Sequence, residues 1–201
     1  MPTPSRHPFA ASAAPGHWLG LAAGHARNAD ADHLLHRLAA ELPLPVAALG
    51  QTHRVGPGRL GLSLGLPDPA TARAAAGWLA AAAPEVAVAE AAGGATRGPE
   101  RWRADAAAAL AAAPQGGRAV LFPGAAELPA TLTVGELLSR TAIDAVRVLG
   151  GSAAGPEALV ETRNHLRPDR ANGLLTLQLA PSRAGFVPFE VPDPHPCCGA
   201  H

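Results

Sequence analysis

The residues best suited to chemistry lie together at the end of the chain, in the run His195-Pro196-Cys197-Cys198-Gly199-Ala200-His201. This run holds both cysteines of the protein and two of its nine histidines. Thiolate and imidazole groups are the ligands that zinc and related soft metals prefer. Cys198 and His201 are three positions apart, so one helical turn would bring them to the same side. We therefore expect the tail, residues 193–201, to bind a metal ion, with zinc as the leading choice.

The adjacency of the two cysteines limits this hypothesis. Structural zinc sites usually separate paired cysteines by about two to four residues, because neighbouring side chains in an extended chain point in opposite directions. Cys197, Cys198 and His201 therefore need a further ligand, for which His195 and His165 are the candidates. Two alternatives stay open, namely a strained vicinal disulfide and an exposed tail with two unreactive thiols.

A second group of histidines lies near the N-terminus and comprises His17, His25, His33 and His36. His33 and His36 are three positions apart on an expected helix, so both side chains can face one way. His25 lies just upstream with Asp30 or Asp32, and histidine with carboxylate is a metal-ligand set used for hydrolysis. Solvated or capping histidines at a helix start are the alternative interpretation.

Arg163, His165 and Arg167 alternate along the segment 159–167, which we interpret as a strand, although Pro156-Glu157 could equally start a helix there. On a strand they share one face, which could hold a carboxylate or a phosphate through charge-assisted hydrogen bonds. This pattern supports a small enzyme acting on a phosphorylated or carboxylated substrate, with a solvated face as the alternative. The glycine-rich stretch 150–155 could likewise present backbone amides to a phosphate, or form a plain turn.

Composition restricts the classes of protein to consider. The chain has 201 residues, of which 48% are hydrophobic, and its formal net charge is zero. It therefore offers no electrostatic attraction for nucleic acid or a membrane surface, and no apolar run approaches the length of a membrane span. We expect a cytoplasmic protein in a reducing compartment, since adjacent cysteines cannot form a disulfide framework, with residues 1–16 as a disordered leader.

Hydrophobic periodicity predicts the elements of the region 17–92. Apolar residues at helical spacing indicate a helix over 31–42, with Asp30 as its cap, and Asp68 followed by Pro69 starts a second helix that ends near residue 82. Strands are expected at 17–23, 46–53, 59–66 and 86–91. The order strand, helix, strand, strand, helix, strand is that of a ferredoxin-like sandwich.

The strand over 59–66 makes a more specific prediction. Its leucines, at every second position from 60 to 66, lie on one face, whereas Gly61, Ser63 and Gly65 lie on the other. Such a glycine-bearing face is typical of a strand against which another element packs closely.

The second half continues as an α+β arrangement that alternates strands and helices in part. Residues 93–117 are expected to form a linker and an alanine-rich helix that starts near residue 100. The second α/β region, 118–192, contains expected strands at 118–122 and 145–149 and a helix at 133–140. Strands at 174–179 and 186–191 then form a C-terminal antiparallel hairpin or meander, with turn signals at Asn172-Gly173 and at 182–185.

Three stretches of the C-terminal third are similar to a group of high-GC bacterial proteins. They are Thr162-Arg163-Asn164-His165-Leu166-Arg167-Pro168, Pro188-Phe189-Glu190-Val191-Pro192 and Pro196-Cys197-Cys198-Gly199-Ala200-His201. The resemblance implies that the tail belongs with the last sheet, and it assigns no activity. A non-enzymatic interaction module remains a further hypothesis, in which the tail and the sheet edges contact another protein or a second copy of the chain.

Overall fold

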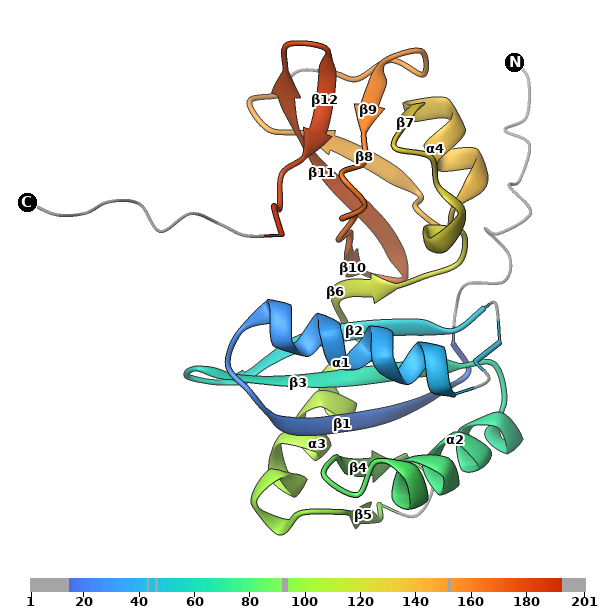
Figure 1. The fold of residues 1–201 in the computed structure, drawn as a ribbon, viewed down its shortest axis with the longest axis vertical. Coiled ribbons are helices and arrows are strands. Elements are labelled where there is room, and N and C mark those ends of the chain that lie inside the picture. Colours follow the sequence, from blue (N-terminus) through green and yellow to red (C-terminus); the bar gives the residue numbers. More distant parts are fainter. Residues whose placement is uncertain (1–14, 43, 46, 92–93, 152, 193–201) are drawn as a thin grey trace, which may run out of the picture.

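The structure is a computed structural model that describes residues 15–42, 44–45, 47–91, 94–151 and 153–192. These residues form a mixed α+β fold with four α-helices and a 12-stranded sheet, which confirms the α+β class (Figure 1). Along the sheet the strands run in the order β5-β4-β1-β3-β2-β6-β10-β11-β12-β9-β7, and β8 pairs with β11.

The first half supplies the N-terminal part of this sheet and three helices. Its elements are β1 (His17–His25), α1 (Asn28–Glu41), β2 (Leu49–Gly56), β3 (Arg59–Leu66), α2 (Pro69–Ala82), β4 (Ala87–Glu90), β5 (Thr96–Arg97) and α3 (Glu100–Ala112). Asp68 caps α2 as expected, since its carboxylate accepts a hydrogen bond from Thr71 N at 2.8 Å. The cap predicted for α1 is wrong, because that helix begins at Asn28 and Asp30 instead forms an ion pair with Arg27.

Both faces of the central strands are covered. The leucines of α1 and α2 pack with those of β1 and β3 in one core, while α3 lies against the opposite face (Figure 1). On that face a Cβ placed on Gly61 would lie 2.7 Å from Ala109 Cβ, which confirms the predicted close packing. Since β3 lies between β1 and β2, its leucines are in the core and offer no sheet edge to a partner.

The second half continues the same sheet through the antiparallel pairing of β6 with β2. Its elements are β6 (Gly116–Leu121), the short 3₁₀-helix η1 (Ala125–Glu127), β7 (Thr131–Thr133), α4 (Val134–Arg140), β8 (Ala145–Val148), β9 (Leu159–Glu161), β10 (Asp169–Ala171), β11 (Leu174–Ser182) and β12 (Gly185–Pro188). β11 and β12 form the expected antiparallel hairpin, and α4 begins with a capping box between Thr133 and Glu136.

The strand predicted over 159–167 is wrong in most of its length. β9 ends at Glu161, and the next residues turn, with positive φ angles of 54° at Arg163 and 50° at Asn164. The Asn172-Gly173 turn instead joins β11 to β10, which lies between β11 and β6. A loop over 162–168 therefore crosses toward α1, and this loop supplies two residues of the site described below.

Candidate functional site

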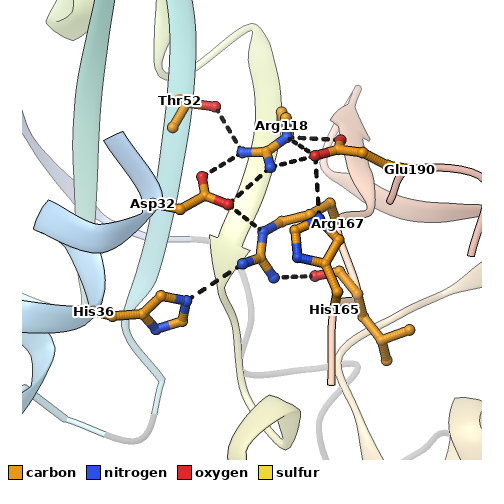
Figure 2. A network of polar contacts seen from close by, with 8 residues as sticks. Asp32, His36, Thr52, Arg118, His165, Arg167 and Glu190 are labelled. Atoms are coloured by element: carbon orange, nitrogen blue, oxygen red, sulfur yellow. Dashed lines mark hydrogen bonds and ion pairs between the residues drawn. The ribbon is translucent and has the colours of Figure 1, made fainter. Parts of the chain in front are cut away.

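A network of charged side chains joins the two halves of the chain (Figure 2). From the first half, α1 contributes Asp32, which contacts Arg118 on β6, and His36, which lies one turn further along the helix near Arg167. The loop 162–168 contributes His165 and Arg167, and Glu190 follows β12. The network is mostly buried, with side-chain exposure of 8% for Asp32 and Arg167 and 13% for Arg118.

Arg118 holds two carboxylates at once. Its Nη1 donates to Asp32 Oδ1 at 2.6 Å and its Nη2 to Asp32 Oδ2 at 2.9 Å, a bidentate pair. Its Nε donates to Glu190 Oε2 at 2.7 Å, and its Nη2 also contacts Glu190 Oε1. Thr52, the neighbour of Arg118 on β2, accepts a further bond at 3.3 Å. The planar guanidinium thus fixes α1, β6 and the end of β12 relative to one another.

Arg167 extends the network from Asp32 to His36, an exposed residue of α1. Its Nε donates to Asp32 Oδ2 at 2.7 Å and its Nη1 to the carbonyl of Leu166 at 2.8 Å. Its Nη2 lies 3.4 Å from Nε2 of His36, and His165 Nε2 lies 3.4 Å from Glu190 Oε1. Two arginines and two carboxylates therefore balance, with two histidines at the margins.

The surroundings alter the protonation of three of these groups. Burial favours the neutral form of Asp32, but hydrogen bonds and charges from Arg118 and Arg167 outweigh it and lower the pKa of that carboxyl below 3.8. Burial, reinforced by the charge of Arg167, lowers the pKa values of His36 and His165 below 6.5. Both rings are therefore neutral at pH 7.

A pocket of 610 Å³ opens beside Arg167, between the second half of α1 and the C-terminal region. Most of its lining is apolar and comes from α1 and the segment after it, β6, η1 and the loop after β9. The lining residues are His36, Ala39, Ala40, Leu44, Pro45, Ala48, Val120, Leu121, Phe122, Ala125, Ala126, Leu128, Thr162, Asn164, Leu166 and Arg167. Arg167 and His36 form the nitrogen-bearing part of its wall, and the pocket is of the size that small-molecule sites usually have.

The structure brings together only part of each predicted group. Arg167 and His165 join the network, whereas Arg163 turns away to pair with Glu161 at 3.6 Å, so the shared strand face is wrong. Of these four N-terminal histidines, His36 is the one that lines the pocket. His17 and His25 lie at opposite ends of β1, and His33 lies one turn before His36 on α1. The turn at Gly150 and Gly151, with positive φ angles of 90° and 81°, fits the plain-turn interpretation.

The predicted tail ligands lie outside the described residues. These are His195, Cys197, Cys198 and His201, all within 193–201. The remaining predicted metal ligand, His165, lies outside the tail, is 8% exposed and contacts Glu190. Within the described part of the chain, no three His, Cys, Asp or Glu side chains are grouped so that they could hold a metal ion.

Sequence reasoning did not single out Arg118 or Glu190, and it considered Asp32 only as a partner of His25. A usable signal was present, because Arg118 interrupts an otherwise apolar strand and Asp32 borders the leucine stripe of α1. A charge on a buried element needs a partner of opposite sign. Pattern alone does not say which carboxylate that partner is.

A second buried polar pair lies on the α3 face of the sheet, where Nε2 of His53 is 2.8 Å from Ser63 Oγ. Burial lowers the pKa of His53 from 6.5 to about 4. Between these values the unfolded chain binds a proton that the folded chain does not, so the stability contributed by neutral His53 is complete above pH 6.5. We expect this contribution, up to about 3 kcal/mol, to be lost as the pH falls from 6.5 toward about 4.

Urea unfolding at a series of pH values measures this loss. His53→Gln, which cannot titrate, should flatten the slope of the unfolding free energy over that window. His33→Gln removes an exposed histidine and should leave the slope as in the wild type. Equal slopes for His53→Gln and the wild type would contradict the assignment.

None of the helices in the described ranges has the length and apolar character that a membrane span requires. Comparison of the chain with protein-family models, with curated proteins and with solved structures found no match. A function for this chain therefore has to come from its own residues and their geometry.

Proposed function

We propose that the chain binds a small amphipathic molecule that carries a carboxylate or phosphate group. The supporting observation is the pocket of 610 Å³ in which a nearly buried arginine, Arg167, and His36 lie at one part of a mostly apolar wall. An apolar cavity with a few converging polar groups is the usual form of a small-molecule site. The apolar lining would hold the hydrocarbon part of the ligand, and Arg167 would orient its acidic group.

Small side chains create this pocket. Alanines 39, 40 and 48 line it from the α1 side, and alanines 125 and 126 line it from η1. Larger residues at these places would fill the space that the ligand needs. Both walls belong to elements fixed by the Arg118 network or by the hydrophobic cores, so the cavity is held open before the ligand arrives.

Titration calorimetry with octanoate tests the proposal. We expect Ala39→Leu and Ala125→Leu, one from each wall, to weaken octanoate binding by at least about tenfold. Ala80→Leu adds the same side chain on an exposed face of α2 and should bind as the wild type does. Absence of octanoate binding to the wild type, or equal binding by all the variants, would refute the pocket assignment.

A metal site that includes the tail is the second candidate function. The observation that favours it is the place of His165, whose ring contacts Glu190 two residues before the last described residue, Pro192. The described part of the chain thus ends two residues after a contact with an imidazole, one of the ligand types that zinc accepts. In this proposal Cys197, Cys198 and His201 bind the ion, with His165 or His195 completing the shell.

Metal analysis of protein purified without chelators tests this second candidate. The wild type should contain about one equivalent of zinc, as a single closed site requires. A Cys197→Ser/Cys198→Ser variant should contain almost none, while His33→Gln should keep the full amount. A wild-type protein without metal, or a double variant that retains it, would exclude the tail site.

We infer a ferredoxin-like sandwich for the first half. The lateral order β4-β1-β3-β2 supports it, as does the packing of α1 and α2 in one core with β1 and β3. The helix α3 would then be an addition that covers the sheet face which a bare sandwich leaves open.

A further inference from the structure

Two nitrogen atoms, one from Arg167 and one from His36, lie side by side at the pocket wall. Nη2 of Arg167 is 3.4 Å from Nε2 of His36. An arginine N–H can only donate, so in this contact Nε2 of His36 accepts and the ring carries its proton on Nδ1. Each nitrogen of Arg167 has one partner among the described residues, which leaves one N–H on Nη1 and one on Nη2 for a ligand.

The fixed charges behind this wall cancel. Arg118 and Arg167 contribute two positive charges, and Asp32 and Glu190, which they bind, contribute two negative charges. An anion that enters the pocket therefore introduces the first uncompensated charge. In a mostly apolar cavity such a charge is costly unless a proton or a cation accompanies it.

We propose that the ligand binds through a single carboxylate and that His36 takes up one proton when it binds. This inference rests on the proposed function of the pocket. Protonation converts Nε2 of His36 from an acceptor into a donor, so that His36 and Arg167 each donate to one carboxylate oxygen. The negative charge of the carboxylate and the proton on His36 then cancel. A phosphate dianion would keep one negative charge unbalanced, and the site therefore discriminates against it.

The groups around His36 are consistent with this proton uptake. Asp32 and His33 lie near it on α1, and His165 and Arg167 lie near it on the loop 162–168. Burial and the charge of Arg167 lower the pKa of His36, while Asp32 opposes them. A bound carboxylate acts in the same direction as Asp32 and raises that pKa. Binding should therefore tighten as the pH falls from about 8 to about 6, by up to about tenfold per pH unit.

Calorimetry in two buffers of different ionisation enthalpy counts the protons taken up per octanoate bound. At about pH 7 the wild type should take up a proton, and octyl phosphate should bind at least about tenfold more weakly than octanoate. His36→Gln keeps a polar side chain that cannot titrate, so it should bind octanoate without proton uptake and with little dependence on pH. His33→Gln, three residues away on the same helix, should behave as the wild type.

The outcomes separate this inference from the function on which it rests. Octanoate binding without proton uptake would overturn the role of His36 and leave the pocket assignment standing. Uptake that persists in His36→Gln would also overturn it, since the proton would then reside on the ligand or on another group. Octyl phosphate binding as tightly as octanoate would overturn the carboxylate preference. No octanoate binding at all would reject the proposed function itself.

Discussion

Replacing Arg118 with methionine is expected to lower the free energy of unfolding by about 3–5 kcal/mol. The arginine neutralises Asp32, whose side chain is 8% exposed, and also binds Glu190. Methionine matches much of the length of the arginine stem but leaves the Asp32 carboxylate with Arg167 as its remaining charged partner in the network. An uncompensated buried charge costs far more than a surface ion pair contributes, and this asymmetry determines the size of the effect.

Urea unfolding of wild type, Arg118→Met and a matched variant measures this loss. Arg147→Met removes an exposed arginine from β8 and should change stability by less than about 0.5 kcal/mol. The double variant Asp32→Asn/Arg118→Met should lose less unfolding free energy than the sum of the two single losses. The reason is that Asp32→Asn removes the charge that Arg118 would have to neutralise. A loss below about 1 kcal/mol for Arg118→Met would show that the network contributes little to stability.

Replacing Gly20 with alanine is expected to cost at least about 3 kcal/mol, the upper end of the range for overpacked cores. A Cβ at this position would lie 2.1 Å from the carbonyl oxygen of Ala106 and 2.6 Å from the amide nitrogen of Leu110. Both atoms belong to the backbone of α3, so no side-chain rotation relieves the contact. The helix as a whole would have to move away from β1 and lose its close packing on the sheet.

Gly77 provides the matched control for this change. It lies on an exposed face of α2, and a Cβ there meets nothing within 4 Å. Gly77→Ala should raise the free energy of unfolding by about 0.5–1 kcal/mol, because alanine is the better helix former. Opposite signs for the two glycine-to-alanine changes in urea unfolding are the expected result. A Gly20→Ala protein as stable as the wild type would contradict the contact between β1 and α3.

The Arg118 network and the ligand pocket are connected through Arg167. This residue binds Asp32 with its Nε atom and presents its remaining donors beside His36 at the pocket wall. A guanidinium held by a buried carboxylate and a backbone carbonyl loses little further freedom when a ligand binds. The ion-pair network therefore serves both to join the halves and to orient the group that would recognise an acidic ligand.

Local patterns in the sequence predicted most of the secondary structure. The Asp68-Pro69 start of α2, the Thr133 start of α4 and the leucine alternation of β3 all depend on neighbours within a few positions. The glycine face of β3 even predicted the close packing that α3 provides. The strand predicted over 159–167 is wrong in most of its length, because the side chains alternate as in a strand but the backbone turns at Arg163 and Asn164.

The sequence by itself determined which residues could do chemistry and the local elements that carry many of them. It named Arg167 and His165 on one expected strand and His36 on an expected helix, for unrelated reasons. Only the tertiary structure decided that these three meet Asp32, Arg118 and Glu190, over separations of up to 135 positions along the chain. The physical reason is that spacing rules hold within one helix or strand, whereas a site between elements depends on sheet order and on the direction of a loop.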